Sequence, residues 1–155
     1  MDVPETVRFE RLVSWPDRPD HRVKYFAGTA TYRCEFAQPG GPGDRFWLDL
    51  GSVEALAEVR LNGENLGVLW KPPFRLDLSS VALRKVNTLE VKVTNVWLNR
   101  LLGATRHPRG LPGAGQPQFE PYLAAEVSPQ LGDRLVPSGL MGPVRLIPCR
   151  QVAVE

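Results

Sequence analysis

Hydrophobic and polar side chains alternate along much of the first hundred residues. The alternation recurs in five segments, at 28–36, 45–50, 57–61, 74–78 and 87–97. Each segment has one apolar and one polar face, which is typical of antiparallel strands with a single buried side. The side chains that we expect to point inward are Ala30, Tyr32, Cys34, Phe36, Phe46, Leu48, Leu50, Ala57, Val59, Leu61, Phe74, Leu76, Leu78, Leu89, Val91 and Val93.

Turn signals separate these segments, and no window shows a helical period. Asn62-Gly63 predicts a tight hairpin, because both residues tolerate the positive φ of a type I′ turn. The stretch 52–59, "SVEALAEV", offers at most one helical turn before its pattern becomes strand-like. Short strands joined by Gly/Pro turns predict an all-β fold, an antiparallel sandwich or barrel. The segment 143–154 indicates a closing strand and a tail, and pairing near the first strand would complete a jelly-roll sandwich.

The length of 155 residues suits a single domain. We expect the core within about 22–102 and 136–150. The segment 103–135 is rich in Gly and Pro and weakly periodic. A loop of this length is usually functional or disordered.

Composition and charge limit the classes of function. A formal net charge of +2 with scattered Lys and Arg does not favour a nucleic-acid partner. No apolar stretch approaches the roughly 18 residues of a membrane span, and the N-terminus lacks the pattern of a secretory signal. The chain offers neither an Asp/Asn-rich loop for calcium nor a cysteine spacing for zinc, so we expect no metal and no cofactor.

Cys34 and Cys149 are the only cysteines. They lie in predicted strands near opposite ends of the chain, and a disulfide requires that those strands are neighbours. Cys34 shares its predicted inward face with Tyr32 and Phe36. The pattern therefore favours a buried free thiol over a disulfide.

Four phrases, in this order, carry a family resemblance. They are "YFAGTATYRCEF" (25–36), "WLDLGSVEALAEVRLNGENLGVLWKPPFRLDLSSVAL" (47–83), "NTLEVKVTNVWLNRLLG" (87–103) and "PSGLMGPVRL" (137–146). Together they resemble the galactose-binding-like jelly-roll domain that accompanies glycoside hydrolases, including the sugar-binding domain of family 2 β-glycosidases. The phrases "LGVLWKPPFRLDL", "TNVWLNRLLG" and "PSGLMGPVRL" more particularly resemble the C-terminal β-domain of family 106 α-L-rhamnosidases. The stretch between Leu102 and Pro137 aligns with neither.

The resemblance implies a fold and a glycan context, and it does not imply that this chain is catalytic by itself. Glycoside hydrolysis needs two carboxyl groups about 5 to 10 Å apart across the scissile bond. The acidic strand residues lie on predicted polar faces, where solubilising charges belong, and both histidines adjoin turns without a nucleophile elbow. These residues are Asp49, Glu58, Asp77, Glu90, His21 and His107.

Sugar recognition combines an aromatic face with planar polar groups that bond pairs of hydroxyls. Both kinds gather in two stretches, and the candidates for a carbohydrate site or an interface are Trp70, Lys71, Asn95, Trp97, Asn99 and Arg100. Trp70 and Trp97 occupy predicted inward positions, so core packing is the favoured alternative for them, with Asn95 bonded to loop backbone. Asn99 and Arg100 either contact a ligand or partner, or are solvated. In a third alternative, the corner "WKPPF" at 70–74 docks onto a catalytic barrel, because Trp and Arg are frequent interface anchors.

We therefore expect a non-catalytic carbohydrate-binding or accessory domain of a glycoside hydrolase that is similar to an α-L-rhamnosidase and acts on plant-type or microbial polysaccharide. The alternative is a structural docking domain without sugar affinity. The expected partners are a carbohydrate and a hydrolase catalytic domain, and an exposed patch would also allow two copies to pair. The family context implies secretion or periplasmic export, and the start at "DVPETVRFE" suggests a domain from a longer chain.

Overall fold

The computed structural model describes residues 6–38, 40, 45–107 and 134–149. Along the chain, the elements are η1 (Trp15–Asp17), α1 (His21–Lys24), β1 (Thr29–Ala37), β2 (Arg45–Asp49), β3 (Ser52–Glu54), β4 (Leu56–Leu61), β5 (Glu64–Leu69), β6 (Arg75–Asp77), β7 (Val86–Thr94), α2 (Leu98–Arg106), β8 (Gly139–Gly142) and β9 (Arg145–Cys149). Of the predicted loop at 103–135, residues 103–106 belong to α2 and residues 108–133 lie outside the described residues, as does the predicted tail beyond residue 149.

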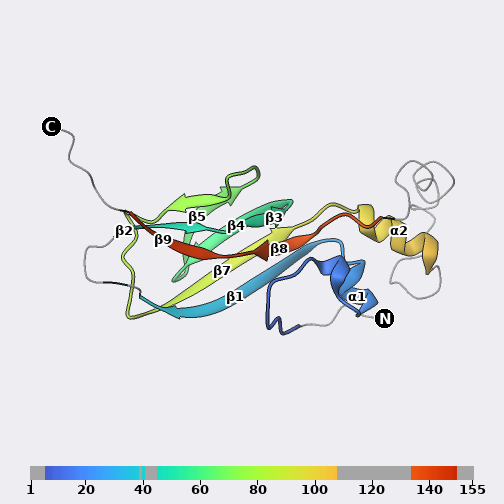
Figure 1. Cartoon of the computed structure of the whole chain (residues 1–155), viewed down its shortest axis with the longest axis horizontal. Coiled ribbons are helices and arrows are strands. Elements are labelled where there is room, and N and C mark those ends of the chain that lie inside the picture. Colours follow the sequence, from blue (N-terminus) through green and yellow to red (C-terminus); the bar gives the residue numbers. More distant parts are fainter. Residues whose placement is uncertain (1–5, 39, 41–44, 108–133, 150–155) are drawn as a thin grey trace.

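The strands form antiparallel sheets, and the predicted β-sandwich is confirmed. The strand orders are β1-β7-β4-β5, β6-β2-β9 and β3-β8. The longest strands run side by side along the long axis, and α2 lies beyond one end of them (Figure 1). The closing strand is β9, and it pairs with β2 and not with β1: Ile147 lies opposite Trp47. The segment before β8 instead meets the N-terminal region, where Trp15 donates its backbone N–H to the Ser138 carbonyl at 3.0 Å.

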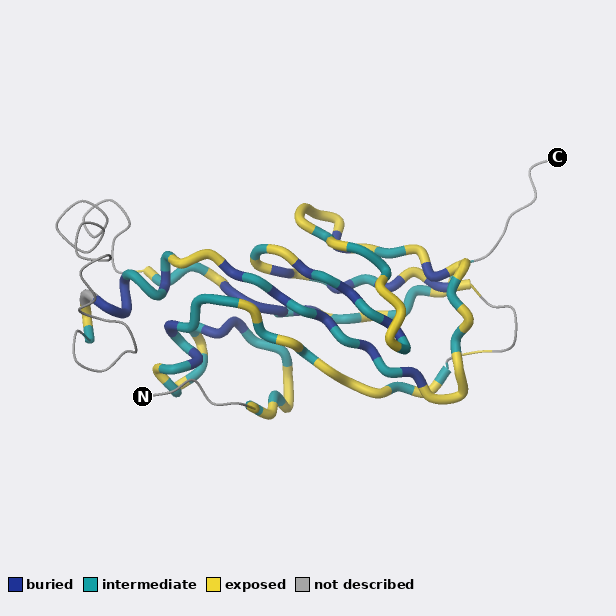
Figure 2. Tube along the Cα trace, turned by 180° about the vertical axis from the view of Figure 1, so that it is seen from behind, coloured by how far each residue is buried: buried dark blue, intermediate teal, exposed yellow. Residues whose placement is uncertain are grey.

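The hydrophobic core joins inward side chains of the two larger sheets with residues from β3 and β8. Val59, Val91 and Val93 at its centre are at most 1% exposed, so the central strands β4 and β7 bury the predicted face completely. Figure 2 shows this as dark blue positions alternating with teal along β7. The predicted inward residues Phe46, Leu48, Leu50, Ala57, Leu61, Phe74, Leu78 and Leu89 are also buried.

The hairpin between β4 and β5 is confirmed, with φ of 54° at Asn62 and 86° at Gly63. A bulge within it changes the faces of β5. Val59 pairs with Gly67 and Arg60 with Asn65, so one residue of β5 has no paired residue in β4. Because one extra residue moves every later side chain to the other face, the second half of β5 has the opposite faces to those expected from simple alternation.

Two helices and one 3-10 turn correct the prediction that no helix is present. In α2, the buried positions are Asn99, Leu102 and Gly103 together with Ala104. Their spacing of three and four residues is helical, but an Asn and a Gly stand where apolar side chains would reveal the period. The stretch 52–59 forms β3 and β4 and no helical turn.

Both cysteines are free, as predicted, but Cys34 is exposed and not buried. The reason is its strand. β1 lies at the edge of its sheet and pairs only with β7, so no neighbouring strand covers the thiol although it shares a face with Tyr32.

Candidate functional site

Exposed apolar side chains gather on the outer face of the four-stranded sheet, at the end where β4 begins and β5 ends. Glu58 pairs with Val68 and Ala57 with Leu69, so the next step of the register places Trp70 opposite Leu56. Val68 and Trp70 are 50% and 68% exposed. We call Leu56, Val68 and Trp70 the outer patch. Position 56 lies on the face of β4 where the alternation predicts polar side chains. The leucine at this position was the sequence signal for an exposed apolar surface, and it was missed.

The prediction that Trp70 packs in the core is wrong, because the bulge turns Val68 and Trp70 outward while Leu69 faces in. Nearby, the Lys71 ammonium lies 5.0 Å from the centre of the Trp70 ring. A cation at this distance is attracted to the face of an indole. One face of Trp70 is therefore taken by its own neighbour.

Trp97 is 57% exposed, so core packing is also wrong for this side chain. β7 ends at Thr94, and Trp97 adopts helical backbone angles, φ −73° and ψ −6°, as it leads into α2. The chain thus leaves the sheet before the inward alternation reaches Trp97. Val96 is also exposed, and Val96 and Trp97 follow the end of β7 that pairs with Leu56, so the chain carries them past the strand end that borders the outer patch.

Asn95 bonds to loop backbone, which confirms the structural alternative for this residue. Its Oδ1 accepts a hydrogen bond from the Gly28 N–H at 3.0 Å, and its Nδ2 donates to the Phe26 carbonyl at 2.8 Å. The side chain is buried. Its amide fork is used to fasten the start of β1 to the end of β7 and does not face solvent.

Asn99 is fully buried, so neither ligand contact nor solvation describes it. Its Nδ2 donates to the Val136 carbonyl at 2.7 Å and to Ser138 Oγ at 3.0 Å, and its Oδ1 accepts from the Val136 N–H at 2.8 Å. The backbone N–H of Ser138 in turn donates a hydrogen bond to Ser14 Oγ at 3.0 Å. This network holds α2, the segment before β8 and the N-terminal region together.

Arg100 is half-buried, and desolvation lowers the pKa of its guanidinium. Of the six predicted site residues, the structure therefore leaves Trp70, Lys71, Trp97 and part of Arg100 at the surface. The two asparagines are structural.

The acidic residues considered for catalysis are held by turns or by basic side chains. Asp49 Oδ1 accepts from the Gly51 N–H at 2.9 Å and its Oδ2 from Arg75 Nε at 2.9 Å, and these bonds lower its pKa. The Ser79 hydrogen bonds lower the pKa of Asp77. Glu58 and Glu90 form ion pairs on the outer face, with Arg60, Lys92 and Arg33.

His21 and His107 pack against each other, with ring centroids 4.7 Å apart, and Tyr25 Oη lies 3.4 Å from His107 Nε2. These contacts join α1 to the end of α2. They give the two histidines a packing role.

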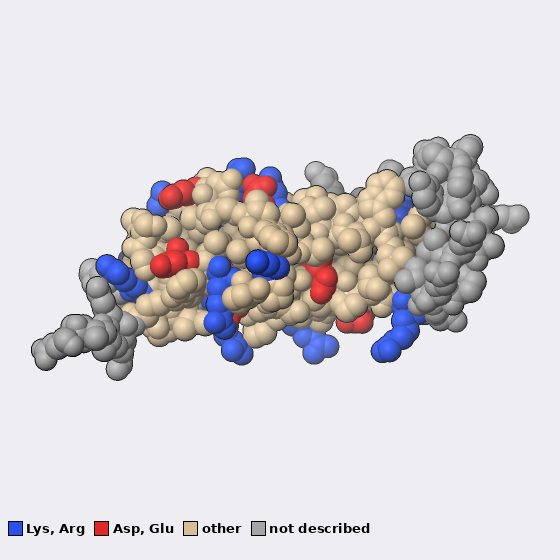
Figure 3. Space-filling model, turned by 90° about the horizontal axis from the view of Figure 1, so that it is seen from above, with Lys and Arg blue, Asp and Glu red and all other residues tan. Residues whose placement is uncertain are grey.

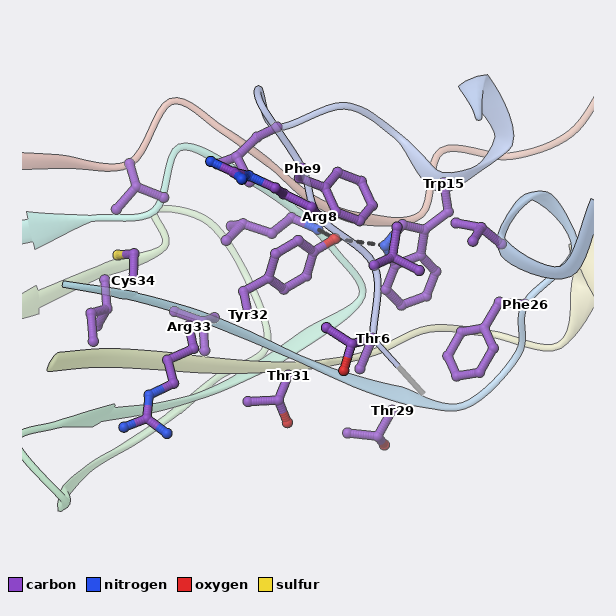
Figure 4. A pocket seen from close by; sticks show the side chains of 18 of the residues that line it. Thr6, Arg8, Phe9, Trp15, Phe26, Thr29, Thr31, Tyr32, Arg33 and Cys34 are labelled. Atoms are coloured by element: carbon purple, nitrogen blue, oxygen red, sulfur yellow. Dashed lines mark hydrogen bonds between the residues drawn. The ribbon is translucent and has the colours of Figure 1, made fainter. Parts of the chain in front are cut away.

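A groove of about 940 Å³ lies between the segment 6–12 and β1. The Phe9 and Tyr32 rings approach within it, with centroids 5.8 Å apart. The Tyr32 hydroxyl accepts from Trp15 Nε1 at 2.6 Å and from the Leu140 N–H at 3.1 Å, and burial raises the pKa of this phenol. In Figure 4, Trp15 lies on one side of Tyr32 and Cys34 on the other, along β1.

Charge on the surface is mixed. In Figure 3, Lys and Arg side chains are spaced between Asp and Glu side chains and do not gather into one basic area. Among the described residues, no group of three His, Cys, Asp or Glu side chains is placed to hold a metal. Within the same residues, no helix is both long and apolar enough to cross a bilayer.

Known proteins similar to this chain include glycosidases. No protein-family model matches it. The chain is 38% identical over 158 residues to a protein of Formosa agariphila named "Putative beta-glucuronidase", an alignment that covers 90% of this chain and 14% of that protein. The solved rhamnosidase of Novosphingobium sp. PP1Y superposes with a TM-score of 0.73 at 37% identity, over 93% of this chain and 13% of the enzyme. A β-glucuronidase of an uncultured Clostridium sp. matches 54% of this chain, with a TM-score of 0.49.

The similarities to the Formosa agariphila protein and to the rhamnosidase agree with the family resemblance of the sequence phrases. The chain spans about one seventh of the curated relative and of the rhamnosidase that it matches. Its similarity is to one part of those enzymes, and that part is an antiparallel β-sandwich. The chain accordingly resembles an accessory β-sandwich domain of glycoside hydrolases, similar to one part of a rhamnosidase.

Proposed function

We propose that this chain serves a glycoside hydrolase as a docking domain, with the outer patch as the surface that packs against another domain of that enzyme. The observation that carries the proposal is that the candidate amide side chains are buried while a group of apolar side chains is exposed. The amides of Asn95 and Asn99 are consumed inside the domain, while Leu56, Val68 and Trp70 are exposed together. A surface that is apolar and lacks amide forks fits a protein partner better than a sugar.

The geometry of Trp70 supports the same partner. Lys71 lies over one face of the Trp70 ring, so a sugar could stack only on the other face. Exposed tryptophans within apolar patches are common anchors of protein interfaces. The "WKPPF" corner adds rigidity, since the fixed φ of its prolines reduces the conformational freedom lost on docking.

Co-expression of this chain with the remainder of its parent hydrolase, as two polypeptides, tests the proposal. We expect a complex in size-exclusion chromatography, and truncation of a central interface tryptophan costs at least about 2 kcal/mol, or roughly 30-fold in Kd. The variant Trp70→Ser, alone and with Val68→Asp, is therefore expected to dissociate it. Val86→Ser is the matched control, because Val86 is an exposed valine at the opposite end of the same sheet.

Sugar binding is the competing function. Tryptophan fluorescence titrated with L-rhamnose, galactose and glucuronate separates the two. Carbohydrate binding would replace docking if sugar caused saturable quenching that Trp70→Ser removes, while Trp70→Ser left the complex with the hydrolase intact. A flat titration together with a complex that depends on Trp70 supports docking.

A further inference from the structure

The strand β1 has an unpaired edge nine residues long. β1 is hydrogen-bonded only to β7. At the two ends of this ladder, the Asn95 N–H donates to the Gly28 carbonyl and the Gln38 N–H to the Lys85 carbonyl. Gly28 and Gln38 are even-numbered, and bonded pairs alternate along an antiparallel ladder. Even-numbered residues of β1 therefore bond to β7, and odd-numbered ones direct their N–H and carbonyl groups away from it.

These outward groups are the backbone donors and acceptors of Thr29, Thr31, Arg33, Glu35 and Ala37. None of them has a partner among the described residues. Such an edge is a template for another strand. The groove beside it is lined from both faces of β1, by Thr31 and Arg33 on one and by Tyr32 and Cys34 on the other. It runs along the strand with the segment 6–9 as its other wall, and the five odd-numbered residues of β1 are all exposed.

We infer that this edge pairs with the same edge of a second copy of the chain, antiparallel and centred on Cys34. A two-fold axis at Cys34 places Arg33 of each copy directly opposite Glu35 of the other. Shifting the centre by one residue places either Arg33 opposite Arg33 or Glu35 opposite Glu35, and like charges directly opposite are destabilising. Of the registers centred on Arg33, Cys34 and Glu35, only the one centred on Cys34 places opposite charges across the pair. Charge thus selects that register.

The same register gives consistent contacts on the other face. Tyr32 stands opposite Phe36 of the second copy, and aromatic cross-strand pairs are favourable. Cys34 stands opposite its own counterpart at a non-hydrogen-bonded position, where Cα atoms are about 4.5 Å apart. This separation lies within the range that a disulfide spans. Cys34 is exposed, so it reports on the pairing without any rearrangement of the core.

Oxidation with diamide tests the register. Diamide converts two thiols into one disulfide and takes up their two hydrogens as it becomes a hydrazine. Neighbouring side chains desolvate Cys34 and raise the pKa of its thiol, so the reaction is run at mildly alkaline pH, where more thiolate forms. We expect a covalent dimer on a non-reducing gel, which dithiothreitol reverses. Cys34→Ser is expected to abolish it, and Cys149→Ser, which removes the only other cysteine, to leave it unchanged.

Charge reversal tests the pairing without any cross-link. Arg33→Glu and Glu35→Arg each convert two attractive pairs into two repulsive ones, so each is expected to weaken the dimer at least about tenfold in sedimentation equilibrium. The double variant that exchanges the two charges is expected to restore it. Thr31→Pro gives an independent readout, because its N–H points away from β7 and its loss blocks strand addition but spares the ladder.

A chain that stays monomeric over a wide concentration range would overturn the inference, as would a dimer that both single reversals leave intact. A dimer that Trp70→Ser dissociates but Thr31→Pro does not would place the contact on the outer patch. Such a result would refute the β1 pairing and leave the proposed docking surface to its own test.

Discussion

Replacement of Asn99 by alanine is expected to destabilise the whole domain. The side chain is fully buried and makes three hydrogen bonds, two to the Val136 backbone and one to Ser138 Oγ. A net hydrogen bond contributes about 1 kcal/mol. Their loss, with the Val136 groups only partly able to reach water, lowers the free energy of unfolding by about 2–3 kcal/mol. For a domain of this size each kcal/mol corresponds to about 2–4 °C in Tm, so we expect a drop of about 4–12 °C.

Urea unfolding followed by tryptophan fluorescence measures the effect, since the chain has four tryptophans. Val96→Ala is the matched control, because Val96 is exposed just before the same helix and its truncation is expected to change stability by less than about 0.5 kcal/mol. Asn99→Asp keeps an acceptor for the Val136 N–H but places a carboxylate against the Val136 carbonyl. It is expected to be at least as damaging as alanine.

A double-mutant cycle with Ser138→Ala isolates the contact between the two side chains. We expect a coupling of about 1 kcal/mol, since each single change already breaks the shared bond. Additive effects would refute the contact between the two side chains, and an Asn99→Ala variant within about 0.5 kcal/mol of the wild type would refute the structural role of Asn99.

Three further substitutions probe the backbone, the groove and the acid limit. At Gly139, φ +96°, an alanine Cβ would lie 2.8 Å from the Tyr32 hydroxyl, whereas a Cβ at Gly63, φ +86°, meets nothing within 4 Å. Alanine at Gly63 therefore costs only the conformational strain of positive φ, about 1–2 kcal/mol. Thermal melts should show that Gly139→Ala lowers the free energy of unfolding by clearly more than Gly63→Ala. Tyr32→Phe leaves two N–H groups, at 2.6 and 3.1 Å from the hydroxyl, without their acceptor, and urea curves should show a loss of about 2–3 kcal/mol, with no change contradicting this. Hydrogen bonds from Arg22 lower the pKa of Asp20 from 3.8 to about 2. The stability that ionised Asp20 contributes is complete above pH 3.8 and is lost as pH falls through about 2. The Tm difference between the wild type and Asp20→Asn should therefore shrink over that range, and a difference that grew would contradict this.

The strands were predictable because one face of each is buried against a shared core. Ala57, Val59 and Leu61 alternate with polar side chains, and this period survives whatever the loops do. The Asn62-Gly63 hairpin was equally predictable, since its two positive φ angles restrict the residues that fit. These features depend on neighbours in sequence, which a single sequence displays.

What could not be predicted depends on neighbours in space. The bulge opposite Val59 and Arg60 reverses the faces of the later part of β5, and alternation alone then assigns Trp70 to the wrong side. Cys34 has an inward parity, but parity does not reveal that β1 is an edge strand. Asn99 reads as a polar surface residue until the segment at Val136, thirty-seven positions away, is seen to satisfy its amide. Each error comes from a pairing over long sequence distance.

The two proposed surfaces lie toward opposite edges of one sheet and can be occupied together. The order β1-β7-β4-β5 places the free edge of β1 three strand spacings from β5, or about 14 Å at about 4.8 Å each. Mutations at this separation with no shared partner usually act additively. Trp70→Ser should therefore leave the Cys34 cross-link unchanged, and exchange of Arg33 and Glu35 should leave the hydrolase complex unchanged. If either variant disturbs both assemblies, the two surfaces are coupled through the sheet, and a single interface that includes the β7 end near Trp97 becomes the better account of both.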